Sequence, residues 1–234
     1  MIISYYFTSA PDPQGRVSIN RSDPAYIQAW YDSVVKHGLK PVLFHDGITT
    51  DFINHFPELK TIQVPPVPLR MQLHDYHWVI SHNYLIRHKE IENLFFTDCP
   101  DCEVINNPFI QEGYDSTKLY CADEPETITE SKWIQHCLKN PVWANMEGFA
   151  EILASNEALY NGGVLGGGRD IVLKFTGLIS ELVEQVKFRI NDGTGDMALY
   201  NYILHKHFNP VHGFPVNSVF KAYENRNDVW FKHK

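Results

Sequence analysis

The hydrophobic pattern of the first hundred residues alternates between short apolar runs and amphipathic segments. Apolar runs predict strands over residues 2–8 and 41–46. Between them, apolar positions at helical spacing predict a helix that begins at Ser22-Asp-Pro24 and ends at His37-Gly38. A strand, a helix and a strand in this order form the unit of a parallel sheet. The pattern continues with an expected helix over 51–60, a strand over 61–64, a helix over 71–89 and a strand over 93–97.

The second half is less regular but contains the same two kinds of element. We expect short strands over 103–105, 117–121, 159–168, 217–223 and 229–231, and helices over 128–138, 169–189 and 196–207. No linker is long enough to split the chain. The sequence therefore predicts a single α/β domain over 1–234, with a mixed, mostly parallel central sheet flanked by helices.

Composition and charge exclude several classes of protein. The chain is 44% hydrophobic and 21% charged, which is typical of a globular protein. Its 28 acidic residues against 20 Lys and Arg give a net charge of −8, which argues against a nucleic-acid partner. No apolar run approaches the roughly 18 residues of a transmembrane segment. The N-terminus lacks the basic region of a signal peptide, so we expect a cytoplasmic location.

The four cysteines do not form a zinc-binding pattern. Cys99 and Cys102 make one CxxC, but no second pair follows at zinc-finger spacing. A redox dithiol is one interpretation of this pair. The other, which we favour, is a set of reduced cysteines in a cytosolic protein.

A pair of carboxylates follows the apolar strand over 93–97. Asp98 and Asp101 come directly after Leu94-Phe-Phe-Thr97. Ligands of open α/β sheets bind beyond the carboxyl ends of the strands. Two hard oxygen ligands there suit Mg²⁺ or Mn²⁺ carrying a diphosphate. The alternative is a solvated turn shaped by Pro100.

Two further segments also have a functional and a structural interpretation. Asn161-Gly-Gly163 interrupts a strand, which indicates close approach of a ligand or, alternatively, a bulge or tight packing. Asp196 stands where the helix over 196–207 begins. It is either a helix cap or a carboxylate that accepts a proton or a hydroxyl hydrogen bond in a site.

Taken in order, these segments resemble a nucleotide-sugar glycosyltransferase of the GT-A fold. The resemblance covers nearly the whole chain. Within this family, the chain also resembles small glycosyltransferase domains of large algal DNA viruses. The matching segments are Ile3-Ser-Tyr-Tyr-Phe-Thr-Ser-Ala-Pro-Asp-Pro-Gln14 (first strand and nucleotide loop), Asp75-Tyr-His-Trp78 (a helix usually reading Asp-Tyr-Arg-Phe/Trp), Phe96-Thr-Asp-Cys-Pro-Asp-Cys-Glu-Val104 (the "DxD" strand), Tyr160-Asn-Gly-Gly-Val-Leu-Gly-Gly167, and Asp196-Met-Ala-Leu-Tyr-Asn201. Two positions depart from the family pattern: the acidic pair is spaced D-x-x-D, and His77 stands where an arginine is usual.

The resemblance implies a nucleotide-binding half over about 1–105 and a half for the sugar and the acceptor over about 106–234. It implies a metal site for Mn²⁺ or Mg²⁺ made of Asp98, Asp101 and His233, with Asp98 also close to the ribose or diphosphate. Other residues implied to contact the nucleotide, its phosphates or the sugars are Thr8, Ser9, Ala10, Arg16, Asp75, Asn161, Gly162, Gly163 and Lys234.

The resemblance also implies the reaction. Asp196 would be the base of an inverting reaction, or would stabilise the oxocarbenium-like state of a retaining one. Asp123 and Glu124 are the next candidates for the base, with a solvated acidic loop as the alternative. The expected activity is metal-dependent transfer of a hexose from a nucleoside diphosphate sugar, UDP preferred, to a hydroxyl of a glycan or glycoprotein acceptor. Two alternatives stay open, namely a sugar nucleotidyltransferase and a non-catalytic sugar- or nucleotide-binding domain.

Overall fold

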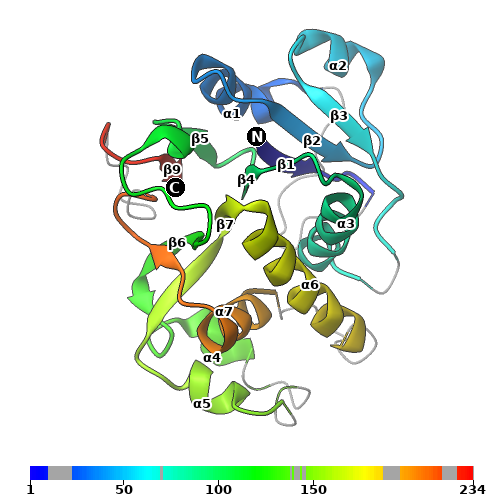
Figure 1. Ribbon diagram of the computed structural model, residues 1–234. Helices are drawn as coiled ribbons and strands as arrows, with labels where there is room; N and C mark the ends of the chain where they lie inside the picture. The colour runs from blue at the N-terminus through cyan, green and yellow to red at the C-terminus, as the bar shows by residue number, and fades with distance from the viewer. Residues whose placement is uncertain are drawn as a thin grey trace.

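The computed structural model describes residues 1–9, 23–68, 71–137, 139, 143, 146–186, 196–217 and 226–233. In these residues a seven-stranded mixed sheet runs through both halves of the chain, in the order β3-β2-β1-β4-β7-β6-β8 (Figure 1). The first four strands are mutually parallel, as the sequence predicts. They are β1 (Ile2–Tyr6), β2 (Pro41–His45), β3 (Lys60–Gln63) and β4 (Asn93–Thr97).

The second half extends this sheet with strands of mixed direction. β7 (Ala158–Gly168) is antiparallel to β4, and β6 (Leu119–Thr127) is antiparallel to β7. The two-residue strand β8 (Val211–His212) is parallel to β6. The β6–β7 register shifts between Cys121, which pairs with Leu165, and Ala122, which pairs with Asn161. Gly162 and Gly163 therefore lie in an irregular part of the ladder, next to the end of β4.

A small separate sheet corrects two of the sequence predictions. The strand expected over 103–105 forms as β5 (Cys102–Val104), one residue earlier. It pairs antiparallel with β9 (Phe231–His233), so that Cys102 faces His233 in the register. The predicted strand over 229–231 begins only at 231. Asn217 makes an isolated bridge to Phe231, and the rest of the predicted strand over 217–223 lies outside the described residues.

Helices cover both faces of the large sheet (Figure 1). On one face α3 (Leu73–Arg87), α6 (Arg169–Val186) and α7 (Asp196–His207) pack together. Their core includes Trp78, whose ring centre lies 5.2 Å from that of Phe175 and 5.8 Å from that of Tyr200. The other face carries α1 (Ala25–Lys36), which contacts β5, and α2 (Thr50–His55). There the buried Trp30 donates its Nε1 hydrogen to Thr97 Oγ1 at 2.8 Å.

Several helices differ in length from their predictions. α2 ends at His55, short of residue 60, because Phe56 precedes Pro57 and the residue before a proline disfavours the helical conformation. The helix expected over 128–138 forms only as α4 (Lys132–Cys137), after a turn at 128–130. A short helix that the sequence did not predict, α5 (Phe149–Leu153), follows it. Within the described ranges, no helix has both the length and the apolar character needed to cross a membrane.

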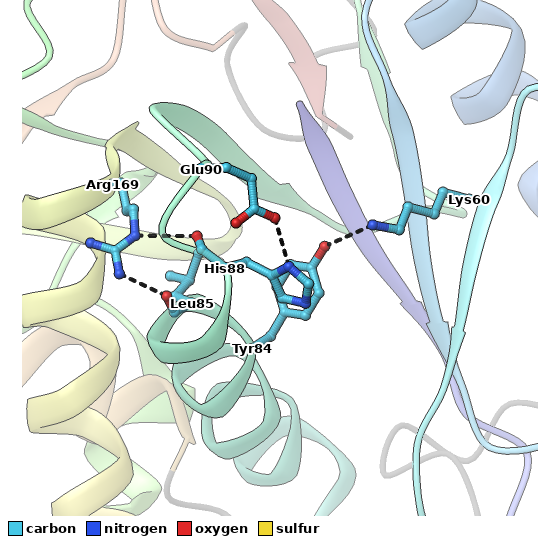
Figure 2. A network of polar contacts seen from close by, with 6 residues as sticks. All are labelled: Lys60, Tyr84, Leu85, His88, Glu90 and Arg169. Carbon is cyan, nitrogen blue, oxygen red and sulfur yellow. Dashed lines mark hydrogen bonds and ion pairs between the residues drawn. The ribbon is translucent and has the colours of Figure 1, made fainter.

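A polar network fixes α3 at the edge of the sheet where β4 begins (Figure 2). Arg169, the first residue of α6, donates to the carbonyl of Leu85 at 2.8 Å and to that of His88 at 3.4 Å. These carbonyls belong to the last turn of α3, where a helix has unsatisfied acceptors and a negative dipole end. The contact ties the start of α6 to the end of α3. Because α3 connects β3 to β4, its other end, with Asp75, lies at the opposite edge of the sheet.

Candidate functional site

The carboxyl ends of the parallel strands β1, β2 and β4 meet at one edge of the sheet. Thr8, Asp46 and Asp98 follow these three ends. The helix α3 begins at the same edge. This edge is where open α/β sheets bind ligands, and it gathers most of the site residues that the sequence predicts and the structure describes.

The loop after β1 is held by a carboxylate that the sequence analysis missed. The backbone nitrogens of Thr8 and Ser9 donate to Asp46 at 2.9 and 2.7 Å, and Thr8 Oγ1 donates to it at 3.1 Å. Burial alone would raise the pKa of Asp46, but these hydrogen bonds outweigh it and hold the pKa below its usual value. An ionised Asp46 therefore fixes the position of Thr8 and Ser9. Ala10 and Arg16, also predicted for this loop, lie outside the described residues.

The two aspartates after β4 occupy a turn that is anchored on both sides. The backbone nitrogen of Asp98 donates to the carbonyl of Gly163 at 3.1 Å, and that of Asp101 donates to the carbonyl of Asp98 at 3.4 Å. Asp98 is exposed and Asp101 is half-buried, so the turn presents carboxylates at the edge of the sheet.

The cysteines of this turn point into the core. Cys99 donates its thiol hydrogen to the carbonyl of Tyr5 at 3.2 Å, and both Cys99 and Cys102 are buried. Burial raises the pKa of Cys99 to about 12 and that of Cys102 well above its usual value. Because the thiolate is the reactive form, this environment favours the interpretation as reduced structural cysteines over a redox dithiol.

The Asn161-Gly-Gly163 segment links three parts of the edge. Asn161 donates from Nδ2 to Glu124 Oε1 at 2.5 Å and accepts from the backbone nitrogen of Gly163 at 2.6 Å. A Cβ atom on Gly163 would lie 2.3 Å from Nε2 of His233 and 2.9 Å from Asn161 Oδ1. The glycine therefore lets the imidazole of His233 lie directly against the strand. Asp98, Gly163 and His233, which are far apart in the sequence, meet at this point.

Replacement of Gly163 by alanine is expected to destabilise the protein by about 1–3 kcal/mol, because the added methyl group overlaps a buried imidazole. Gly162→Ala is the matched control, since a Cβ atom there meets nothing within 4 Å. Urea unfolding of both variants measures the difference. Equal unfolding free energies would contradict the placement of His233 against Gly163.

Asp75 is a buried carboxyl group at the start of α3. It is 7% exposed, and among the described residues its Oδ1 atom has no hydrogen-bond partner. Burial is the main cause that raises its pKa to about 7, the negative charge of Asp196 raises it further, and His74 opposes the shift. The charge of Asp196, at the start of α7, thus acts on Asp75, and Asp75 is a carboxyl group that holds a proton near neutral pH.

His77 is a neutral group where the sequence resemblance would place an arginine. Its ring stacks on Tyr5 with centres 4.5 Å apart, and only 9% of the residue is exposed. Burial, with a smaller contribution from His74, lowers its pKa well below the usual value. This position therefore supplies no permanent positive charge.

The position of Asp196 depends on a second residue of α7. The buried Asn201 accepts a hydrogen bond from the backbone nitrogen of Tyr160 at 2.8 Å and donates to the carbonyl of Tyr160 at 3.0 Å. These two bonds attach α7 to β7 next to Asn161. The start of the helix, with Asp196, is held near the candidate site as a result.

The remaining two acidic candidates have different partners. Glu124 contacts Asn161, as described above. Asp123 lies opposite Tyr160 in the register, and its Oδ2 lies 2.9 Å from Nδ1 of His212 on β8. Glu124 therefore belongs to the group around Gly163, whereas Asp123 belongs to a pair with β8 that the sequence did not indicate.

The expected metal ligands, Asp98, Asp101 and His233, are residue types that bind divalent cations. Two carboxylates and an imidazole are ligands that Mn²⁺ accepts, and carboxylates suit Mg²⁺. Asp98 and His233 meet through the same residue, Gly163. Across the described ranges, however, no three His, Cys, Asp or Glu side chains converge as a ready metal site. A cation bound by fewer of these side chains would need further ligands from water or a bound molecule. Lys234 lies outside the described residues.

Comparison with known proteins identifies the fold. No family model matches the chain, and no curated protein matches its sequence. Among solved structures, the chain is similar to that of the galactosyltransferase LgtC in complex with donor and acceptor sugar analogues. The identity is 14%, the match covers 99% of this chain and 86% of that chain, and the TM-score is 0.53. The protein has a GT-A-like fold. In this GT-A-like fold the Asp98–Asp101 turn, Gly163 and His233 share the carboxyl edge of the sheet.

Proposed function

We propose that the protein is a metal-dependent glycosyltransferase, which moves a hexose from a nucleoside diphosphate sugar, UDP preferred, to an acceptor hydroxyl of a glycan. The observation that carries this proposal is the meeting of Asp98, Gly163 and His233 at the carboxyl edge of a GT-A-like sheet. It is supported by the loop of Thr8 and Ser9, which Asp46 fixes at the end of β1.

In this proposal Asp98, Asp101 and His233 would hold Mn²⁺ or Mg²⁺. The cation would neutralise the charge of the diphosphate as it leaves. Thr8 and Ser9 would line the base and the ribose, and their fixed backbone would position the nucleotide without further ordering. Asp75, protonated near neutral pH, can donate a hydrogen bond to a hydroxyl of the donor sugar, and Gly162 and Gly163 would let that sugar approach the strand.

Asp196 is our first candidate for the base that accepts the proton of the acceptor hydroxyl. Its neighbour Asp75 takes up a proton near neutral pH, so Asp75 suits a hydrogen-bond donor better than a base. A positioned base contributes about 10²–10⁴-fold to such a reaction. In a retaining reaction Asp196 would instead stabilise the oxocarbenium-like state. We favour Asp123 and Glu124 less, because each carboxylate already holds another side chain.

A screen of nucleotide sugars for metal-dependent hydrolysis tests the proposal without knowledge of the acceptor. We expect the protein to release UDP from at least one UDP-hexose when Mn²⁺ is present. This release should stop when the metal is chelated. Turnover of a sugar 1-phosphate with UTP would instead indicate a nucleotidyltransferase. Nucleotide binding without any turnover would indicate a non-catalytic domain. The narrower likeness to algal-virus domains and the cytoplasmic location stay predictions from the sequence.

A further inference from the structure

A histidine on β8 is held in a fixed orientation beside the candidate site. Asp123 Oδ2 contacts Nδ1 of His212 at 2.9 Å, and both side chains are partly exposed, at 24% and 36%. The ring of His212 also packs edge-on against Tyr160, with centres 5.1 Å apart. Nε2, on the opposite side of the imidazole from Nδ1, makes no hydrogen bond within the described part of the chain. The pair therefore offers one oriented imidazole nitrogen and a carboxylate to a ligand.

The backbone of Gly213 packs closely against the carboxylate of Asp123. Gly213 has a φ of +66°, and a Cβ atom there would lie 3.0 Å from Asp123 Oδ2. A residue with a side chain would be strained in this conformation. Asn217 Nδ2 also donates to the carbonyl of Asp123, at 3.4 Å. The turn over 213–217 is thus attached to β6 at the position of the Asp123–His212 pair.

Phe214 projects from this turn as an exposed aromatic ring. It is 60% exposed, although most large apolar side chains of the protein are buried. The guanidinium of Arg226 lies 4.7 Å from the ring centre, and Arg226 is itself held by two hydrogen bonds to Asp228 at 2.9 and 2.8 Å. An aromatic ring supported in this way provides a flat apolar surface.

The turn over 213–217 is continuous with the proposed donor end of the site. The backbone nitrogens of Trp230 and Phe231 donate to the carbonyls of Pro215 and Val216 at 2.8 and 3.0 Å, so the turn lies beside β9, which carries His233. Along β7, Tyr160 opposite Asp123 is three residues from Gly163, a span of at most about 11 Å. A ligand on the turn is within reach of a donor sugar at Gly163.

We propose that His212, Asp123 and Phe214 form the acceptor subsite, and that it binds a neutral pyranose sugar. The inference rests on the proposed function and names the substrate class of the same site. The apolar face of a pyranose ring would stack on Phe214, while its hydroxyl groups would bond to Nε2 of His212 and to the carboxylate of Asp123. An apolar surface with a few oriented polar groups is the usual composition of a small-ligand site.

Binding of methyl glycosides to the full chain tests this subsite directly. The probes are the methyl α- and β-glycosides of glucose, galactose and mannose, measured by ligand-observed NMR. We expect at least one to bind, and Phe214→Ala and His212→Gln each to weaken it by about fivefold or more, the size expected for a lost aromatic contact or hydrogen bond. Ile110→Ala, an exposed apolar residue outside the turn, is the matched control and should bind like the wild type.

The outcomes separate this inference from the proposed function. If none of the glycosides binds the wild type, or if both variants bind as well as Ile110→Ala, the subsite is wrong, whatever the hydrolysis of nucleotide sugars shows. If glycoside binding depends on Phe214 and His212 but no nucleotide sugar is hydrolysed, the transferase proposal fails, and these residues form a sugar-binding site that is not an acceptor subsite. Once a donor is known, the two variants should raise the KM for the glycoside, whereas Ile110→Ala should leave it unchanged.

Discussion

Replacement of Asp98 or Asp101 by asparagine should lower metal-dependent hydrolysis of the donor by about 10²-fold or more. Each substitution keeps the shape of the side chain and removes the negative charge that would hold the cation. The charge that develops on the leaving diphosphate would then lose much of its stabilisation, and groups that stabilise developing charge commonly contribute about 10²–10³-fold. The measurement is the rate of UDP release at saturating Mn²⁺.

The control for this loss is Asp170→Asn. Asp170 lies at the opposite edge of the sheet, in the first turn of α6, and its side chain is 98% exposed. It should leave the rate unchanged, and all three variants should unfold at temperatures close to that of the wild type. If both Asp98→Asn and Asp101→Asn hydrolyse the donor at the wild-type rate, these residues are not metal ligands.

The second large effect concerns the stability of the protein against pH. Burial raises the pKa of Asp75 to about 7 in the folded protein, from an ordinary value of 3.8. Between these two values the folded state holds a proton that the unfolded chain has released, so the free energy of unfolding falls as the pH rises. A shift of this size corresponds to about 4 kcal/mol. Below about pH 4 the free energy of unfolding is not lowered by Asp75, and above about pH 7 the decrease is complete.

Asp75→Asn cannot ionise and should remove this part of the pH dependence. The variant is expected to be more stable than the wild type at pH 8 by several kcal/mol, of the order of the 4 kcal/mol above, and similar to it near pH 4. Urea unfolding at pH 4.5, 6 and 8 measures the difference, with the exposed Asp170→Asn as the control that keeps the wild-type profile. Parallel profiles for the wild type and Asp75→Asn would show that Asp75 is ionised in the folded protein.

The parallel half of the sheet could be predicted because its signals are local. Apolar runs and helical spacing within some 20 residues specify β1, α1 and β2, and the order of these elements implies their direction. The directions of β6 and β7 are set by contacts between strands that lie far apart in the sequence. The pairing of Cys102 with His233 in β5 and β9 joins residues 131 apart, and no local pattern indicates it.

The candidate site was predicted unevenly for the same reason. Asp98 was found because it directly follows a buried strand, and Asp46 carries the same signal after β2 but was missed. His212 could not be found, because its significance comes only from Asp123, 89 residues earlier. His233 was expected from the family resemblance alone. Its packing against Gly163 places it next to β7, and its role as a metal ligand stays a prediction.

The central claim is that a divalent cation held by Asp98 and Asp101 binds the diphosphate of a nucleotide. Isothermal titration of the full chain with UDP, with Mn²⁺ and then with a chelator, tests it most directly. We predict that UDP binds at least about tenfold more tightly with Mn²⁺, a difference of about 1.4 kcal/mol or more. Equal affinity with and without the metal, or no binding of UDP under either condition, would contradict the claim.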